Sequence, residues 1–230
     1  DLSYWEAGSR KQALAQTYED DYRRANQFRE MICNKSWLDI GTGAGGILDL
    51  LSPVALESVA IEPQQGIRGE LSKLGYKVFA DIKDVQMSFD VITLFHVFEH
   101  FTQPLEMLKS IKQLLNPGGR VVIEVPHAND FLISSLGLDT FKAFTFWSEH
   151  LILHTRKSLE AFISRIGFVN VSIQGFQRYP LANHLYWLSR HKPGGHIAWN
   201  YLNTPALDQA YADILAKLDK TDTLIAIAEK

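Results

Sequence analysis

The hydrophobic residues of this chain follow two different periods along its 230 residues. Short runs that are continuously apolar, or that alternate apolar with polar residues, predict strands. Between them, apolar residues recur every three or four positions, which predicts amphipathic helices. The predicted strands cover seven ranges: 37–40, 57–61, 76–80, 91–95, 120–125, 169–176 and 223–228.

Helices are predicted in most of the segments that connect these strands. Ser9 is placed to cap the first helix, and Thr204 followed by Pro205 is typical of the start of the last one. The sequence Asn-Pro-Gly-Gly at 116–119 ends a helix and forms a turn before the next strand. The predicted helices cover 9–32, 44–51, 64–74, 104–115, 155–166, 181–190 and 205–218. The apolar residues of the last helix form one face: Leu207, Tyr211, Ile214, Leu215 and Leu218.

A glycine-rich turn separates the first predicted strand from the helix that follows it. Glycines permit positive φ and close approach of the backbone, and the unpaired amides of a first helical turn point at a ligand. The spacing of Gly41, Gly43 and Gly46 also fits the dinucleotide pattern Gly-x-Gly-x-x-Gly, so spacing leaves the ligand open. Asp39 argues against a dinucleotide, because its carboxylate would repel the pyrophosphate. The same carboxylate would attract the ammonium group of a ligand that contains an amino acid.

Composition narrows the class of protein. With 46% hydrophobic residues, the chain can bury one sizeable core, and its formal net charge of -3 favours a small-molecule partner over a nucleic acid. The single cysteine, Cys33, excludes an internal disulfide and is expected to be a small buried residue. No run reaches the about 18 apolar residues of a membrane span, and a signal-peptide pattern is absent, so we predict a cytoplasmic enzyme with no membrane partner.

The stretch Asp39-Ile40-Gly41-Thr42-Gly43-Ala44-Gly45 resembles motif I of the class I methyltransferases that use S-adenosylmethionine (SAM). Three further stretches match that family in order and spacing, so the resemblance covers 37–168. It implies an α/β fold of three layers, Rossmann-like, with a mostly parallel seven-stranded sheet. The last strand is then antiparallel and lies between the fifth and the sixth.

The resemblance also implies one methyltransferase domain over residues 1–230. Residues 1–33 would form an N-terminal helical cover, and residues 176–221 a helical insertion that serves as an acceptor lid or a dimer surface. Tyr4, Trp5 and Tyr18 would either cover the bound molecules or only pack the first helix onto the domain. The protein is expected to be a monomer or a homodimer.

Positions at the ends of the strands supply the expected cofactor site. Asp39 and the amides of Gly41 and Gly43 would hold the amino-acid part of SAM, and Glu62, about 20 residues after the first glycine, its ribose. The family match assigns Asp81 to the adenine amino group, with Ile82 packed on the ring. The predicted cofactor-binding residues are Asp39, Gly41, Thr42, Gly43, Gly45, Glu62, Pro63, Asp81, Ile82, Phe95 and His96. The product would be S-adenosylhomocysteine (SAH).

Two histidines are the candidate catalytic residues. The run Glu149-His150-Leu151 resembles a stretch of sugar C-methyltransferases that carries a histidine base, and an imidazole accepts a proton at neutral pH. His100, in the Glu99-His100 pair, is the second candidate and would act as a base or contact the acceptor. Alternatively, the pair has a structural role and orients its loop. Phe131, Phe141, Phe144, Phe146 and Trp147 precede this run and are expected to shape the acceptor site. The predicted acceptor is a small molecule such as a sugar.

Two other functions stay open at this stage. A nicotinamide-dependent oxidoreductase shares the glycine turn and the later acid, although it leaves Asp39 and Asp81 without a role. A SAM-binding protein without catalysis is the second alternative. The insertion contains three histidines that could hold a metal, His184, His191 and His196. No acidic residue accompanies them at a spacing typical of metal ligands, so the sequence predicts no metal ligands.

Overall fold

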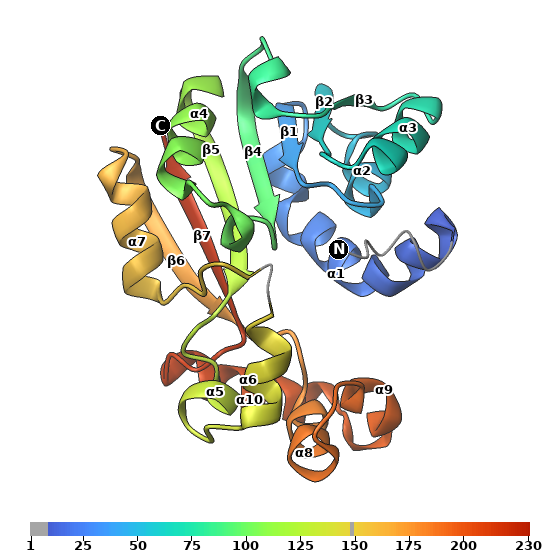
Figure 1. Ribbon diagram of the computed structural model, residues 1–230, viewed down its shortest axis with the longest axis vertical. Coiled ribbons are helices and arrows are strands. Elements are labelled where there is room, and N and C mark those ends of the chain that lie inside the picture. The colour runs from blue at the N-terminus through green and yellow to red at the C-terminus, as the bar shows by residue number, and fades with distance from the viewer. Residues whose placement is uncertain (1–8, 148–149) are drawn as a thin grey trace. The chain divides into compact units, whose positions relative to one another are not determined.

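The computed structural model describes residues 9–147 and 150–230, and its strands form one seven-stranded sheet (Figure 1). The predictions for Tyr4, Trp5 and Glu149 therefore lie outside the described residues. The strand order is β3-β2-β1-β4-β5-β7-β6. The strands are β1 Ser36–Ile40, β2 Glu57–Ile61, β3 Lys77–Phe79, β4 Phe89–Phe95, β5 Leu115–Pro126, β6 Val169–Phe176 and β7 Thr223–Glu229. The predicted number of strands and the predicted place of the last strand, between the fifth and the sixth, are confirmed.

Strand directions also agree with the prediction. β1 pairs in parallel with both β2 and β4, and Asp39 lies between Ala60 and Thr93 in that register. β7 runs antiparallel to β5, because the amide of His127 donates to the carbonyl of Asp222 at 2.9 Å while that of Lys230 donates to Gly119 at 2.9 Å. Later residues of one strand thus face earlier residues of the other.

The chain folds into two compact units. The first unit holds the residues up to Phe95, Leu105–Val122 and Ala228–Lys230, and the second holds His96–Pro104 and Ile123–Ile227. In the part of the chain that the structure describes, no helix is long and apolar enough to cross a membrane.

In the first unit, helices lie beside the parallel strands (Figure 1). They are α1 Arg10–Ile32, α2 Gly46–Leu51, α3 Gln65–Lys73 and most of α4 Pro104–Leu114, with the short 3-10 helix η1 Ile82–Asp84. α1 begins after Ser9 as predicted, and the backbone amide of Ser9 donates to the side chain of Gln12 at 3.0 Å. Trp37, Leu38 and Ile92 are fully buried in the core of this unit.

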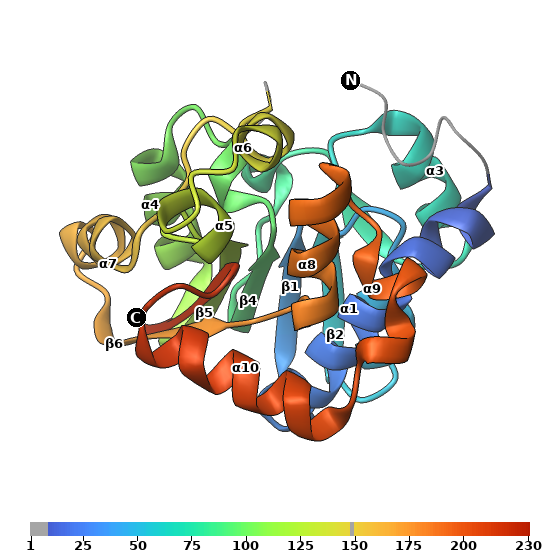
Figure 2. The ribbon, with the colours of Figure 1, turned by 90° about the horizontal axis from the view of Figure 1, so that it is seen from below.

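The second unit contains the remaining helices, of which α8 packs on α9 and α10 (Figure 2). They are α5 Phe131–Ser134, α6 Asp139–Thr145, α7 Arg156–Arg165, α8 Leu181–Arg190, α9 Gly195–Ala198 and α10 Pro205–Lys217, with the 3-10 helices η2 Phe98–His100 and η3 Asn200–Leu202. The Thr204 side chain accepts a hydrogen bond from the amide of Leu207, which confirms the predicted cap of α10. α5, α6 and α9 were not predicted.

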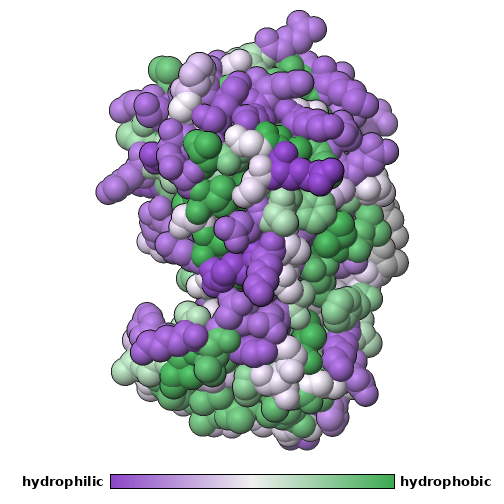
Figure 3. All heavy atoms as spheres, turned by 90° about the vertical axis from the view of Figure 1, so that its left-hand side faces the viewer, coloured by the Kyte–Doolittle hydropathy of each residue, from purple (hydrophilic) through white to green (hydrophobic). Residues whose placement is uncertain are grey.

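One sequence prediction about burial is wrong. Cys33 is exposed rather than buried, because it follows the last turn of α1 instead of lying in its packed stripe. The apolar face of α10 is only partly buried: Leu215 is covered, whereas Leu207, Ile214 and Leu218 are exposed. Hydrophobic residues also reach the surface on the face shown in Figure 3.

The Asn-Pro-Gly-Gly segment also differs from the prediction. It belongs to β5, which begins at Leu115, and is not a separate turn before a strand at residue 120. Gly118 keeps a turn-like backbone, with φ of +73°. A Cβ placed on Gly119 would lie 3.1 Å from the carbonyl oxygen of Phe89 and 3.2 Å from that of Asp90. Strand pairing therefore extends into this segment because glycine permits the close approach.

We predict that Gly119→Ala lowers the free energy of unfolding by about 1–3 kcal/mol, since its Cβ meets backbone atoms that cannot move aside. Gly66→Ala, in α3, is the matched control, because no heavy atom lies within 4 Å of the Cβ it would add. Urea unfolding of both variants measures the effect. Equal stability of the two variants would show that the β4–β5 approach is not as tight as described.

Candidate functional site

The glycine-rich turn lies between β1 and α2 in the first unit. Gly41, Gly43 and Gly45 have φ of +75°, +54° and +77°, a region that side chains with a Cβ rarely adopt. Gly45 is also the N-cap of α2, and a Cβ there would lie 2.6 Å from a methyl carbon of Leu71. The turn thus depends on glycine at these positions, as predicted from the motif.

The amides of this turn already have acceptors within the protein. The amide of Gly41 donates to the carbonyl of Ile61 at 2.8 Å, and that of Gly43 donates to Oε2 of Glu62 at 3.1 Å. This differs from the expectation that both amides face a ligand. The reason is that β2 ends beside the turn and supplies two oxygens to it.

Glu62 is buried at the end of β2, with 4% of its surface exposed. Its Oε1 accepts from the amide of Gln64 at 2.9 Å, while Oε2 accepts from Gly43. Burial raises the pKa of this carboxyl, and the two backbone hydrogen bonds offset part of that rise. Each oxygen retains a second lone pair, which is what a ribose hydroxyl requires.

Asp39 lies at the carboxyl end of β1 and is 2% exposed. The hydroxyl of Thr93 donates to its Oδ1 at 2.6 Å and accepts from the indole nitrogen of Trp37 at 2.9 Å. Burial raises the pKa of Asp39 to about 7, although the Thr93 hydrogen bond acts in the opposite direction. Near neutral pH, a cation beside this carboxyl would favour its ionised form.

Two buried charges on α1 were missed in the sequence. Asp21 accepts a hydrogen bond from the hydroxyl of Thr17 at 2.7 Å, and its Oδ1 lies 3.7 Å from a guanidinium nitrogen of Arg24. Burial raises the pKa of Asp21, and the guanidinium of Arg24 lies 4.9 Å from the ring centroid of Phe95. The available signal was that positions 21 and 24 share a helix face with apolar Phe28, which stacks on Phe95.

α1 also contacts the glycine-rich turn directly. Nε of Arg10 donates to the carbonyl of Ala44 at 2.9 Å, and its Nη2 lies 2.6 Å from the Asp49 carboxylate. A Cβ on Gly46 would collide with the carboxylate of Asp21. The N-terminal helix thus contacts the turn that the motif marks, and its role as a cover of the bound molecules stays a prediction.

The remaining cofactor candidates lie at the ends of β2 and β3. Asp81 is exposed and caps η1 by accepting from the amide of Lys83 at 3.0 Å. Ile82 is buried, and Pro63 is exposed with its carbonyl accepting from Arg68 at 2.9 Å. Their roles toward adenine and ribose stay predictions.

His96 follows the last residue of β4 and belongs to the second unit. Its φ of +55° is unusual for a residue with a side chain. Its Nδ1 lies 3.5 Å from Oε1 of Glu99 and its Nε2 lies 3.3 Å from Oε1 of Glu124. The guanidinium of Arg178 lies 3.1 Å from the same Nε2. The predicted contact of His96 with SAM stays a prediction.

Glu99, on η2, has a fully buried carboxylate that three imidazole rings approach. Besides His96, the Nε2 atoms of His100 and His150 lie 3.9 Å and 4.0 Å from the same oxygen, Oε1. Neither carboxylate oxygen has a hydrogen bond of normal geometry with the described residues. Burial acts to raise the pKa of Glu99, but the nearby His96 and then His100 lower it below its usual range, so the group is a carboxylate.

His150 is held in a defined orientation. Its Nδ1 lies 2.7 Å from the carbonyl oxygen of Thr145, so this nitrogen carries a proton and donates it. The backbone carbonyl of Glu99 accepts hydrogen bonds from the amides of Leu151 and Ile152 at 3.0 Å and 3.2 Å. These bonds keep the segment that follows His150 beside η2. Burial lowers the pKa of His150, which leaves the ring neutral at pH 7 with a lone pair on Nε2. The structure thus brings together the two predicted catalytic histidines.

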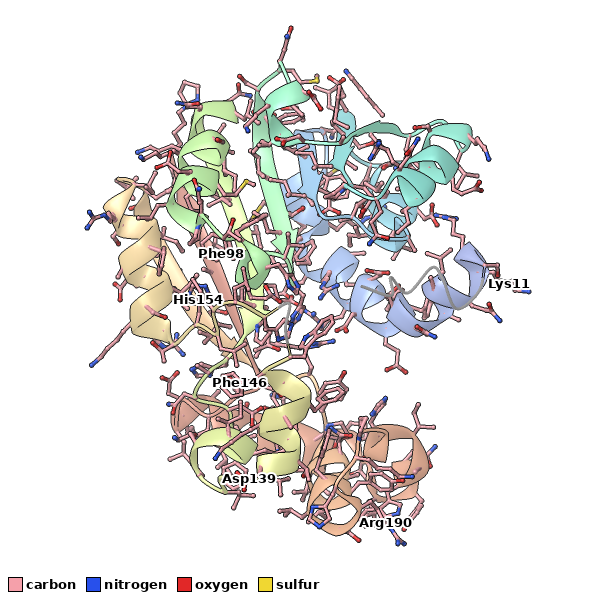
Figure 4. The ribbon with its side chains drawn as sticks, in the orientation of Figure 1. Lys11, Phe98, Asp139, Phe146, His154 and Arg190 are labelled. Atoms are coloured by element: carbon pink, nitrogen blue, oxygen red, sulfur yellow. The ribbon has the colours of Figure 1, made fainter. Side chains whose placement is uncertain are left out.

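His154 is a buried histidine for which the sequence predicted no role. It stacks on Phe98, with ring centroids 5.2 Å apart, and both residues are labelled in Figure 4. Burial lowers the pKa of His154 to about 4. Because Phe98 directly precedes Glu99, this stack supports the backbone that carries the carboxylate.

The aromatic residues expected to shape the acceptor site divide into two groups. Phe141 and Phe144 pack on Trp187 of α8, with centroids 5.0 Å and 5.3 Å from its ring. Trp147 instead lies 5.4 Å from the ring of His150 and 6.4 Å from that of His100, and it is partly exposed. Of these five aromatic residues, Trp147 is the one with described ring contacts to both histidines.

The histidines of the insertion do not form a cluster. His184 contacts the Tyr211 hydroxyl at 2.7 Å, and His196 lies 3.4 Å from the Asn183 side-chain oxygen. Among the described residues, one group of three possible metal ligands has all its ligand atoms within 4.8 Å of one another, and that group consists of Glu99, His100 and His150.

Comparison with known proteins gives a family match and a relative. Residues 13–173 match the family model described as a methyltransferase domain. Over 137 residues the chain is 29% identical to the mitochondrial ubiquinone biosynthesis O-methyltransferase of Schizosaccharomyces pombe. That match covers 52% of this chain and 48% of the relative, so it spans about half the length of the curated relative.

Solved structures show a similar fold at low sequence identity. A SAM-dependent methyltransferase from Archaeoglobus fulgidus has a TM-score of 0.63 at 19% identity, covering 97% of this chain and 96% of that one. A putative methyltransferase of Haloferax volcanii, solved with the Trm112 activator, has a TM-score of 0.64 at 14% identity, with coverages of 98% and 95%. The plantazolicin methyltransferase BpumL, solved with SAH, has a TM-score of 0.61 at 19% identity, with coverages of 94% and 86%.

We predict that Thr93→Val destabilises the protein more at pH 8 than at pH 5. At pH 8 Asp39 is ionised and loses a charge-assisted hydrogen bond of about 1.5–3 kcal/mol, whereas at pH 5 it is protonated and loses less. Thr93→Ser, which keeps the hydroxyl, should show no such pH dependence. Urea unfolding at the two pH values measures the difference, and an equal loss at both would contradict the Thr93–Asp39 assignment.

Proposed function

Because this chain belongs to the class I SAM-dependent methyltransferases, we propose that it transfers the methyl group of SAM to a small-molecule acceptor and releases SAH. The observation that carries the proposal is the buried Asp39 carboxylate at the end of β1, beside the glycine-rich turn. A buried carboxylate is stabilised by a cationic ligand and destabilised by an anionic one. A nicotinamide dinucleotide, with its pyrophosphate, fits this environment poorly.

The first unit offers three buried carboxylates to a cationic cofactor: Asp21, Asp39 and Glu62. SAM carries an ammonium group, a sulfonium and a carboxylate, so its net positive charge offsets part of this negative charge. We assign the ammonium group to Asp39 and the ribose hydroxyls to Glu62, whose lone pairs are not all used. Asp81 and Ile82 are assigned to the adenine.

The acceptor is assigned to Glu99, His100 and His150 in the second unit. Methyl transfer from SAM needs an acceptor atom aligned with the methyl group and, for a hydroxyl, removal of one proton. The oxygen forms a bond to the methyl carbon, the carbon–sulfur bond breaks, and its electron pair stays on sulfur. The proton leaves through the lone pairs of this cluster. A hydroxyl acceptor is consistent with the O-methyltransferase activity named for the yeast relative.

A small metabolite, such as a sugar or a phenol, suits this cluster better than a nucleic acid. The formal net charge of -3 provides no excess of positive charge for a phosphate backbone. The partly exposed ring of Trp147 beside both histidines offers an apolar surface to a small acceptor. We propose that the protein works as a monomer or a homodimer in the cytoplasm.

We predict that SAM binds more weakly as the pH falls from 7.5 to 6. Without ligand, the pKa of Asp39 is raised to about 7, so the unliganded protein loses stability as the pH rises from about 4 to 7. The ammonium group favours the ionised carboxylate, so SAM binding releases a proton below pH 7. Affinity should fall by up to about tenfold per pH unit there.

Calorimetry at pH 6.0 and 7.5, in buffers of different ionisation enthalpy, measures both the affinity and the proton release. Asp39→Asn should bind SAM weakly and without the pH slope. Asp139→Asn, at an exposed carboxylate of α6, is the matched control and should retain the slope. If Asp39→Asn keeps both the affinity and the slope, the ammonium assignment is wrong.

We predict that His150→Gln reduces methyl transfer by about 10²–10⁴-fold while SAM binding stays unchanged. The variant removes the Nε2 lone pair that faces Glu99 and leaves the first unit intact. His191→Asn, at the C-cap of α8 with φ of +54°, is the matched control, because asparagine tolerates this conformation. A screen of nucleotide sugars, phenols and amines with labelled SAM supplies the acceptor.

If His150→Gln retains full activity, His150 has no role in proton removal and the assignment of the acceptor to this cluster is wrong. If the wild-type protein binds SAM but methylates no acceptor in the screen, the alternative of a SAM-binding protein without catalysis gains support. The two results separate an error in the site from an error in the function.

A further inference from the structure

The side chains of Glu99, His100 and His150 each place a possible ligand atom within 4.8 Å of the other two, and the Glu99 oxygens make no hydrogen bond of normal geometry with the described residues. We propose that they bind a divalent metal ion, and that the ion holds the hydroxyl oxygen of the acceptor. This deepens the proposed function and rests on it for the identity of the acceptor. The metal site itself stands on the geometry of the second unit alone.

Two hydrogen-bond acceptors face each other in this cluster. A carboxylate has no proton to donate, and Nδ1 of His150 holds the ring proton in its hydrogen bond to Thr145. The Nε2 lone pair of His150 therefore lies 4.0 Å from Oε1 of Glu99 with no hydrogen on either atom. A positive ion between the two atoms turns this unfavourable contact into two coordinate bonds.

The Glu99 carboxylate is also poorly supplied with donors, since His96, the nearest of the three imidazoles, lies 3.5 Å from its Oε1. It is fully buried, and neither oxygen makes a normal hydrogen bond to the described residues. A buried charge without hydrogen bonds is costly, and such groups in proteins are usually paired or coordinate a metal. Asp39 and Glu62 are also buried, but both accept hydrogen bonds from neighbouring groups. Glu99 differs from them because it has room for a further positive or hydrogen-bonding partner.

The distances fit an ion after a small contraction. Tetrahedral zinc, with bonds of about 2.1 Å, holds its ligand atoms about 3.4 Å apart. Oε1 of Glu99 lies 3.9 Å from Nε2 of His100 and 4.0 Å from Nε2 of His150, and all three ligand atoms lie within 4.8 Å of one another. Both rings are partly exposed at their edges, so small side-chain rotations close the difference.

The surroundings resemble those that orient metal ligands. A metal-binding histidine commonly donates its other ring hydrogen to a backbone carbonyl, as His150 does to Thr145. His96 lies 3.5 Å from Glu99 and 3.3 Å from Glu124, which makes it a positioning residue for the carboxylate. The backbone bonds from Leu151 and Ile152 to Glu99 hold the two segments together.

The donor set indicates which ion binds. Two imidazoles and one carboxylate favour zinc or another first-row divalent ion over magnesium and calcium, which prefer oxygen ligands. Three protein ligands leave a position for an acceptor hydroxyl, whose pKa the ion lowers. The hydroxyl proton then passes to water, and the oxygen attacks the methyl group. In this arrangement His150 is a ligand of the ion rather than the base that the sequence suggested.

The test uses the full chain without a polyhistidine tag, stripped of metal with a chelator. Calorimetric titration with Zn²⁺ should give one site per chain, and Co²⁺ should produce visible absorption bands typical of nitrogen and oxygen ligands. His150→Gln and Glu99→Gln should weaken Zn²⁺ binding by at least about tenfold. His191→Asn should bind as the wild type does. If Glu99→Gln does not fold, His100→Gln replaces it.

The outcomes separate this inference from the proposed function. Zn²⁺ binding that is absent, or equal in His150→Gln and the wild type, overturns the metal site and favours a proton shared between Glu99 and the rings. Methyl transfer at full rate in stripped protein with chelator present also overturns it, although the proposed function then stands. Zinc bound at these residues without methyl transfer to any acceptor supports the site and contradicts the function.

Discussion

The structure depends on how it offsets the free-energy cost of burying carboxylate groups away from water. Asp39 and Glu62 are buried at the ends of adjacent parallel strands, where the β1–β2 register brings them to one edge of the sheet. Each requires donors to offset the cost of burial. Thr93 supplies one to Asp39, and the amides of Gly43 and Gln64 supply two to Glu62. The positive φ of the glycines directs the turn so that one of its amides reaches Glu62.

The same constraint explains why the two units differ. In the first unit Asp39 and Glu62 accept hydrogen bonds from neighbouring groups, and a cationic cofactor would add positive charge beside them. In the second unit neither oxygen of Glu99 has a hydrogen bond of normal geometry with the described residues, and three imidazole nitrogens lie 3.5–4.0 Å from one of these oxygens. Its stacked neighbours Phe98 and His154 make the backbone rigid but donate nothing to the carboxylate. We therefore propose a different positive partner for each unit, a cationic cofactor for the first and a metal ion for the second.

Local signals in the sequence predicted the elements well. The ranges of β2, β6 and α8 agree with the structure, and Ser9 and Thr204 precede their helices as expected. Such signals depend on neighbouring residues in the chain. Burial depends on residues that are distant in the sequence, so the exposure of Cys33 was not predicted. The burial of Asp21 and Arg24 and the hydrogen bonds from the turn amides to Ile61 and Glu62 likewise arise from packing between segments far apart in sequence. α5, α6 and α9 are too short to show a period.

The central claim is that the buried carboxylates of the first unit hold SAM. A crystal structure of the protein with SAH tests it most directly. The account predicts that the ammonium nitrogen of SAH lies within hydrogen-bond distance of Asp39 and that the ribose hydroxyls donate to Glu62. A bound SAH whose ammonium group and ribose contact neither carboxylate would contradict it.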